Sequence, residues 1–328
     1  MRRALCILLA LLLLPVLAVA GLCVFLNTSG GRHFAEDEIN RLAAPGVRIT
    51  GLAGHFPADI RLANLSLADR NGVWLSGKVL ELRWRPLQLL RGDVAVDALT
   101  ASTLGIARAP AASGGGGGIS LPPLRAEIGK LEIGTLSLPS EIAGQPVMLH
   151  VTGAARLFGP AHATMTLDAA TPDNAAQYHL TAALNPKTSA LNLHVSEPPN
   201  GLLGHFAGPE VNAPLLIDAA LSGPSDKAAL TFSATLGSAK LTGAGTLGLL
   251  PRHPFADVTL TMPDITPFAA MGGRTFGGTT QLHLTVAGQG HGNATLALEG
   301  NAAIANPPKP LAKLLGAQES LNVRARLH

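Results

Sequence analysis

Apolar and polar side chains alternate along most of this chain. The alternation is strict over short segments such as 80–84 (LELRW), 191–195 (LNLHV) and 258–262 (VTLTM). Gly, Pro, Asn and Asp separate such segments at intervals of roughly ten to fifteen residues. A period of two residues places successive side chains on opposite faces of a β-strand. The pattern therefore predicts an all-β chain whose strands have one apolar and one polar face.

One segment follows the alternative, helical period. Between Arg32 and Ala44, the apolar Phe34, Ile39 and Leu42 fall at near-helical spacing, and acidic residues occupy the early turns. This spacing predicts a short helix that ends before Pro45-Gly46.

The first 26 residues predict a helix that spans a membrane. An uncharged apolar run from Ala4 to Leu26 follows two arginines. As a helix, its roughly 23 residues would reach about 34 Å, enough to cross the hydrocarbon layer. Arginines before the run and polar residues after it favour a cytoplasmic N-terminus. We therefore expect a single-pass inner-membrane anchor, with the rest of the chain on the outer side.

Two other interpretations of this run stay open. Ala18-Val19-Ala20 has the form of a signal-peptidase site, so the run can be a cleaved signal peptide. A lipoprotein signal that ends at Cys23 needs a small residue before the cysteine, and position 22 is Leu.

Composition excludes several classes of protein. The formal net charge is only +3 and the basic residues are scattered, which argues against nucleic-acid binding. The only cysteines are Cys6 and Cys23, so the part after the apolar run has neither a disulfide nor a cysteine metal site. Charged residues are 14% of the chain, against about 25% in ordinary globular proteins. Such a chain can hide its apolar surface in an extended sheet or against lipid.

The segments combine into an expected organisation. The ranges are 1–26 for a signal-anchor transmembrane helix, 27–45 for a short linker helix, 46–108 for an N-terminal β unit, 109–118 for a Gly-rich loop, and 119–328 for an elongated, repetitive β-sheet body. The loop is equally compatible with an insertion in one continuous sheet. Because the sequence stops in what looks like the middle of a strand, the body is expected to be truncated at its C-terminus.

Residues 47–110 carry a resemblance to a known family. They include 47–57 (VRITGLAGHFP), 65–75 (LSLADRNGVWL), 80–97 (LELRWRPLQLLRGDVAVD) and 106–110 (IARAP). In this order, just behind an N-terminal apolar run, they resemble the N-terminal portion of the TamB-like translocation and assembly module subunits of the AsmA-like family. The resemblance covers about residues 1–110. Beyond them, the chain shares with the family only the alternation of apolar and polar residues.

The resemblance implies an inner-membrane protein with a periplasmic body. It implies an elongated, curved β-sheet (a β-taco or groove) with an apolar concave face that conducts phospholipid acyl chains between membranes. It also implies support of outer-membrane biogenesis and protein insertion, through a BamA-related outer-membrane barrel as partner. That contact belongs to a C-terminal region of the family that this sequence lacks. The alternative is an exported β-rich surface or adhesion protein with a closed core.

No constellation of residues indicates catalysis. His150, His194 and His283 lie in separate predicted strands without a closely spaced second ligand, unlike typical zinc sites. There is no G-x-S-x-G motif of the hydrolase type. We therefore expect no enzyme activity, no catalytic residues, no metal and no cofactor.

Two tryptophans bracket a hairpin-like segment around Ser76-Gly77-Lys78. Trp74 and Trp84 can lie at the mouth of a groove near the membrane, or pack against the helix at 32–44. The neighbouring basic residues Lys78, Arg83, Arg85 and Arg91 can contact lipid headgroups or simply be solvated.

The candidate groove lining is the apolar half of the predicted strands. Its members are Leu65, Leu67, Leu80, Leu82, Val94, Val96, Leu131, Ile133, Leu191, Leu193, Leu230 and Phe232. The pattern alone leaves open whether this face meets lipid or a second sheet, and the family resemblance favours lipid.

Overall fold

The structure is a computed structural model. It describes residues 21–43, 46–110, 125–159, 162–203, 212–249, 255–271, 277–290, 293–305 and 319–327. The fold is mostly β with few helices, as the alternation predicts. The chain forms two compact units, Met1–Pro122 with Ala126–Leu138, and Pro123–Arg125 with Pro139–His328. Most of the Gly-rich loop expected at 109–118 lies outside the described residues.

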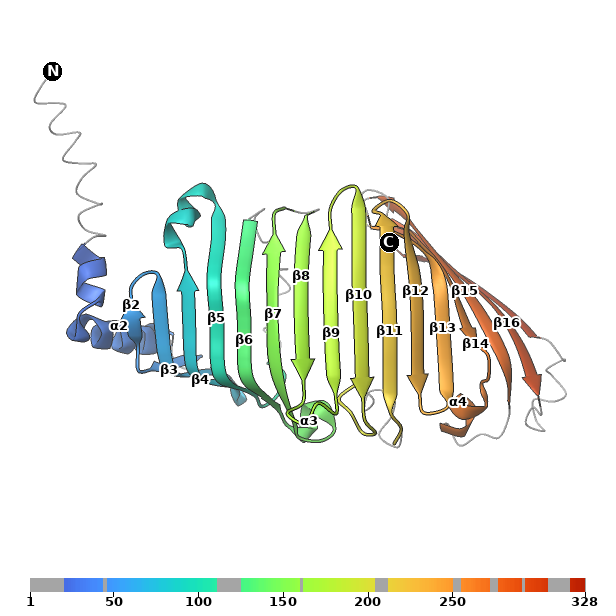
Figure 1. Cartoon of the computed structure of the whole chain (residues 1–328), viewed down its shortest axis with the longest axis horizontal. Helices are drawn as coiled ribbons and strands as arrows, with labels where there is room; N and C mark the ends of the chain where they lie inside the picture. The colour runs from blue at the N-terminus through green and yellow to red at the C-terminus, as the bar shows by residue number, and fades with distance from the viewer. Residues whose placement is uncertain are drawn as a thin grey trace, which may run out of the picture. The chain divides into compact units, whose positions relative to one another are not determined.

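Unit 1 is an antiparallel sheet preceded by a helix. β3 pairs with β1, β2 and β4, and β4 pairs with β5. The elements are α2 (Ser29–Leu42), β1 (Val47–Thr50), β2 (Ala53–His55), β3 (Asp59–Asp69), β4 (Gly72–Trp84), the 3-10 helix η1 (Pro86–Arg91), β5 (Asp93–Ile106) and β6 (Arg125–Leu138). Figure 1 shows them in blue to green, and η1 is the cyan coil between β4 and β5.

Polar side chains join α2 to the sheet. The helix occupies Ser29–Leu42, where the sequence predicts one from Arg32 to Ala44, and the Thr28 hydroxyl caps it by accepting from Gly31 N at 3.0 Å. Asn40 donates to Ile49 O at 2.9 Å and accepts from Ile49 N at 2.8 Å. The apolar positions that suggested the helix do not form its contact surface, because Phe34 and Leu42 are 59% and 72% exposed.

The N-terminal end of α2 follows a further helical stretch at residues 21–26. Most of the anchor predicted between Ala4 and Leu26 lies outside the described residues. Among the helices that the structure describes, none combines the length and the apolar character needed to cross a bilayer.

A kink in β4 keeps the apolar side chains of unit 1 on one face. Val79 has a φ of 48°, a left-handed value that is rare for a β-branched residue. Lys78 and Val79 are both exposed. Beyond them, apolar and polar residues alternate again in the sequence from Leu80 to Trp84. A Cβ at Gly77 would lie 3.1 Å from Leu80 Cδ1. Leu80 and Gly77 therefore share a face although three positions separate them, and Leu82 follows on that same face.

The hairpin expected around Ser76-Gly77-Lys78 is wrong, because β4 runs without interruption from Gly72 to Trp84. Gly77 marks a close approach of side chains and not a chain reversal. The methyl groups of Leu80 and Leu104 occupy the space beside it, at 3.1 and 3.4 Å from its Cβ position. Trp84 packs at the end of the strand, where Nε1 donates to Pro57 O at 2.7 Å.

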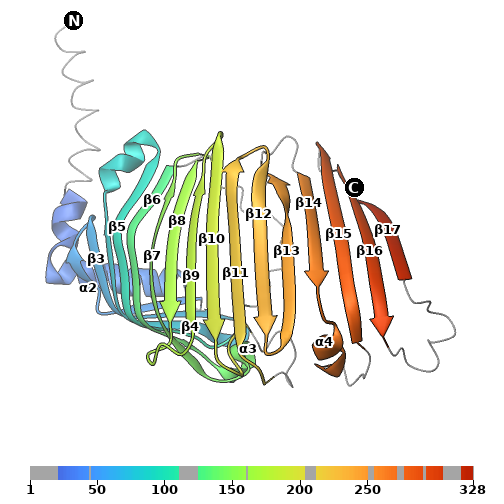
Figure 2. The same cartoon turned by 45° about the vertical axis from the view of Figure 1, so that its right-hand side comes forward.

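Unit 2 is an antiparallel meander in which each strand pairs with the next in sequence. These pairings run from β7 to β17. The elements are α3 (Ser140–Ala143), β7 (Val147–Leu157), β8 (Ala163–Ala170), β9 (Gln177–Leu184), β10 (Thr188–Glu197), β11 (Leu215–Pro224), β12 (Ala228–Leu236), β13 (Ala239–Gly248), β14 (Phe255–Met262), α4 (Thr266–Met271), β15 (Gly277–Gly290), β16 (Asn293–Ala305) and β17 (Glu319–Leu327). Figures 1 and 2 show these strands side by side in a curved sheet.

Candidate functional site: an apolar sheet face

The strand register aligns apolar residues into rows across unit 2. Residues that are directly opposite in an antiparallel pair point to the same face. Consecutive partners from β8 to β16 form one row, which we call the central row: Leu167, Leu180, Leu193, Ala219, Phe232, Gly243, Leu260, Leu282 and Gly300. At about 4.8 Å per strand, this row extends for roughly 38 Å.

A second row runs beside the central row on the same face. Its members are two residues away on each strand: Met165, Ala182, Leu191, Leu221, Leu230, Gly245, Val258, Leu284 and Leu298. The two rows contain no polar side chain. We call the surface that they form the apolar face of unit 2.

The opposite face of the same strands is polar. The corresponding row from β8 to β16 reads Asp168, His179, His194, Asp218, Ser233, Thr242, Thr261, Gln281 and Asn301. A register slip by one residue on any strand would exchange the two sets. The fold therefore separates apolar from polar side chains consistently over many strands.

The apolar face is only partly covered. Its most buried large side chains are Val258 at 7% and Leu221 at 6% exposure, and Leu180, Leu191, Leu193 and Phe232 are half-buried. Met165 is 38% exposed. In a closed sandwich, inward side chains of two sheets interdigitate and lose nearly all contact with solvent. The described residues leave this face accessible along its central part.

The candidate lining residues of the sequence analysis divide between the two units. Leu191, Leu193, Leu230 and Phe232 belong to the two rows of unit 2. In unit 1, Leu65 and Leu67 face Gly77 and Leu75, and the kink at Val79 brings Leu80 and Leu82 to the same side. The remaining candidates lie on β5 and β6: Val94, Val96, Leu131 and Ile133. Every candidate in both units is half-buried.

One buried acid, which the sequence analysis missed, ends the apolar face at β10. Glu197 is 2% exposed, and it lies two residues beyond Val195 on the same side of the strand. Its carboxylate accepts from the Tyr178 hydroxyl at 2.5 Å and from Leu203 N at 2.9 Å. Burial and this hydrogen bond raise the pKa of Tyr178. A buried carboxyl group in an otherwise apolar row is tolerated because these donors satisfy its oxygens.

Histidine–aspartate pairs join neighbouring strands on the polar face. The ring nitrogen to carboxylate distances are 2.5 Å for His179–Asp168, 2.7 Å for His194–Asp218 and 2.7 Å for His283–Asp257. All of these side chains are about half exposed, so each pair stabilises the sheet by at most about 1 kcal/mol. Within the described ranges, no three His, Cys, Asp or Glu side chains converge as metal ligands would.

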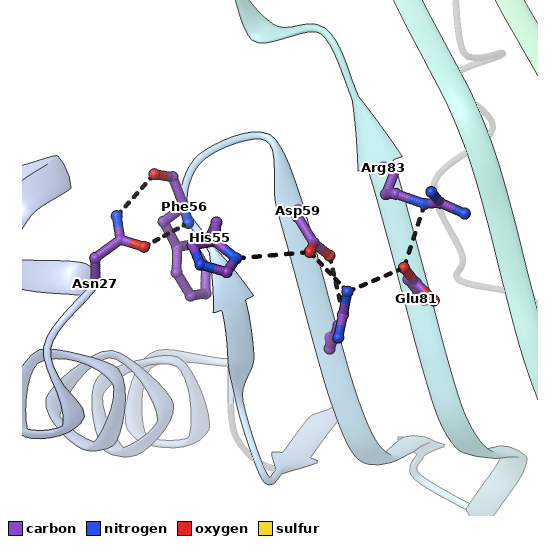
Figure 3. A network of polar contacts seen from close by, with 7 residues as sticks. Asn27, His55, Phe56, Asp59, Glu81 and Arg83 are labelled. Atoms are coloured by element: carbon purple, nitrogen blue, oxygen red, sulfur yellow. Dashed lines mark hydrogen bonds and ion pairs between the residues drawn. The ribbon is translucent and has the colours of Figure 1, made fainter.

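In unit 1, a polar network connects the N-terminal helical residues to the sheet (Figure 3). Asn27 donates to Phe56 O at 2.8 Å and accepts from Phe56 N at 3.1 Å. Ion pairs continue across the strands: His55–Asp59 at 3.9 Å, Arg61–Asp59 at 3.0 Å, Arg61–Glu81 at 3.5 Å and Arg83–Glu81 at 3.2 Å. Carboxylates thus already hold Arg83 and Arg61 on the polar face.

Comparison with known proteins identifies no relative of this chain. No protein-family model, no curated protein and no solved structure matches this chain. The functional interpretation therefore depends on the geometry of the sheets and on the sequence pattern.

Proposed function

We propose that the protein conducts phospholipid between membranes, along the apolar faces of its β-sheets. In this proposal the N-terminal apolar run anchors the chain in the inner membrane, and the sheets lie in the periplasm. This is the role that the resemblance to the TamB-like members of the AsmA-like family implies. Support of outer-membrane biogenesis and protein insertion, with a BamA-related barrel as partner, belongs to the same proposal.

The continuous apolar face of unit 2 carries the proposal. A lipid that crosses an aqueous compartment must keep its acyl chains out of water, because each exposed methylene costs about 0.8 kcal/mol. The two rows offer acyl chains an uninterrupted apolar track from β8 to β16. The half-buried state of Leu193 and Phe232 leaves surface for a chain to cover. Polar side chains on the other face meet water.

The apolar track requires no chemistry from the protein. Transport along it uses burial of acyl chains and no group transfer, so the proposal includes neither an enzyme activity nor a cofactor. Gly243 and Gly245 lie within the rows, and the Leu260 side chain occupies the space beside Gly243.

Native mass spectrometry of the full-length chain tests this function. The protein is extracted from membranes in mild detergent, and co-purified phospholipid is measured for the wild type, for a Leu193→Asn/Phe232→Asn double variant and for a Thr231→Asn control on the polar face. We expect phospholipid with the wild type and the control and strong loss with the double variant. No bound lipid in any form, together with a mature N-terminus at Gly21, would instead support the exported protein with a closed core.

A further inference from the structure

The connection between β4 and β5 exposes a cluster of leucines. Within η1, Leu87 is 78%, Leu89 47% and Leu90 85% exposed. Gly92 closes the turn with a φ of 77°, a conformation that glycine adopts without strain. Three exposed leucines in one short turn are costly in water and typical of a surface that binds a partner or a membrane.

This turn lies at the edge of unit 1 that receives the N-terminal helical residues. Asn27, directly after those residues, is hydrogen-bonded to the backbone of Phe56 at both its N and O atoms. The next residue, Pro57, accepts from Trp84 Nε1 at 2.7 Å, and η1 begins two residues after Trp84. Figures 1 and 2 show η1 and the helical residues before Asn27 along the same upper edge of the unit.

Arg85 and Arg91 lie at the two ends of the leucine turn, and Asp93 follows Gly92 at the start of β5. Arg91 is exposed in the last turn of η1, and it makes no ion pair within the part of the chain that the structure describes. Arg85 precedes the turn and is held by Asp97 at 2.9 Å and Glu127 at 3.4 Å. Arg91 is therefore the side chain that can meet an external anion. An exposed apolar turn with an adjacent cation matches the interface of an anionic bilayer.

We propose that η1 inserts Leu87 and Leu90 into the headgroup region of an anionic phospholipid bilayer, with Arg91 at the phosphates. The bilayer is the one that the N-terminal apolar run enters, so the inference rests on the anchor in the proposed function. The hydrogen bonds of Asn27 hold the end of that run against the sheet edge. The bilayer is therefore the surface nearest to this edge of unit 1. The contact through η1, together with the anchor, fixes the orientation of unit 1 on the membrane.

Depth-dependent quenching in proteoliposomes tests the contact. The full-length chain, with Cys6→Ala and Cys23→Ala, receives a single environment-sensitive dye through Leu90→Cys. The matched control carries Val73→Cys at the other end of β4, about 36 Å from Trp84 along the strand at about 3.3 Å per residue. Val73 is itself 50% exposed, so both sites accept the dye. Vesicles of phosphatidylethanolamine and phosphatidylglycerol contain lipid spin-labelled on the acyl chain.

We expect quenching at position 90 to exceed that at position 73 by at least about twofold, because only the inserted dye reaches the acyl chains. Replacing phosphatidylglycerol by phosphatidylcholine, or Arg91→Glu, should reduce the difference. Equal quenching at both positions in a chain that floats with the vesicles overturns the η1 contact, leaves the anchor in place and assigns the leucines to a protein partner. A chain that does not float contradicts the anchor and the η1 contact together.

Discussion

Leu80 and Gly77 lie on the same face of β4, with Leu80 Cδ1 3.1 Å from the position that a Cβ of Gly77 would take. Ordinary alternation would place residues three apart on opposite faces. The positive φ of Val79 interrupts the alternation there, while the register with β3 and β5 continues unshifted from Lys78 to Leu80. The kink thus lets Leu75, Leu80 and Leu82 contribute to one apolar surface.

Val79→Asn should stabilise the protein. A β-branched residue at a φ of 48° is strained by about 1–2 kcal/mol, and asparagine tolerates this conformation better. Val79 is 65% exposed, so the change removes little buried surface. We expect a higher thermal unfolding midpoint by differential scanning calorimetry. Val73→Asn on the same strand, 50% exposed, is the control and should not raise it. An equal gain at both positions would point to surface polarity and not to backbone strain.

Gly245→Ala should destabilise unit 2 by about 2–3 kcal/mol. A Cβ there would lie 2.1 Å from Asp257 O and 2.7 Å from Val258 Cα, which are backbone atoms that cannot move without separating β13 from β14. Gly243→Ala is the matched control, because its Cβ would meet the flexible Leu260 Cδ2 at 2.8 Å. Urea unfolding should give a smaller loss for Gly243→Ala. A reversed order would contradict the register between these strands.

Tyr178→Phe should cost about 1 kcal/mol at neutral pH, since the buried Glu197 loses one donor and keeps Leu203 N. The pKa of Tyr178 is raised by burial and by Glu197. A group whose pKa is higher in the folded state stabilises fully below its unfolded pKa, about 10 for tyrosine, and loses that contribution as the pH rises above it. The free energy of unfolding of the wild type should therefore fall above about pH 10, and that of Tyr178→Phe should fall less. Parallel curves would show that the hydroxyl is not buried.

Asn27→Ala should loosen the N-terminal helical residues from the sheet of unit 1. The substitution removes both hydrogen bonds to the Phe56 backbone. Because each such bond contributes about 1 kcal/mol, we expect amide hydrogen exchange at Phe56 to accelerate by roughly fivefold or more. The control is Asn64→Ala, whose amide group donates to the Thr50 hydroxyl at 2.9 Å and does not contact this turn. Unchanged exchange at Phe56 would show that Asn27 does not hold the helical residues at the sheet edge.

Local pattern was sufficient to predict strands, because alternation depends only on neighbouring residues. It predicted strands at 80–84 and 191–195, which lie within β4 and β10. It misassigned Gly77 to a hairpin, since glycine marks a reversal and a close side-chain contact equally well in sequence. The apolar rows also depend on the register between strands, which places Ala219 opposite Phe232. The sequence of a single strand does not determine this register.

The polar contacts were the least predictable part of the structure. Glu197 reads as a solvated strand end in sequence, and its burial depends on Tyr178 and on the loop that brings Leu203 N to it. The attachment of α2 through Asn40 was also missed, because the helical period directs attention to Phe34 and Leu42, which are exposed. Each of these contacts joins segments that only the tertiary fold brings together.

Photo-crosslinking at adjacent positions of β10 tests the central claim most directly. A photoreactive amino acid replaces either Leu193 on the apolar face or Asn192 on the polar face, and cells are irradiated before the full-length protein is purified. The same comparison with Leu82 and Arg83 covers unit 1. Our account predicts phospholipid adducts at Leu193 and Leu82 and none at Asn192 and Arg83. Equal capture from both faces, or capture from neither, would contradict an apolar track for lipid.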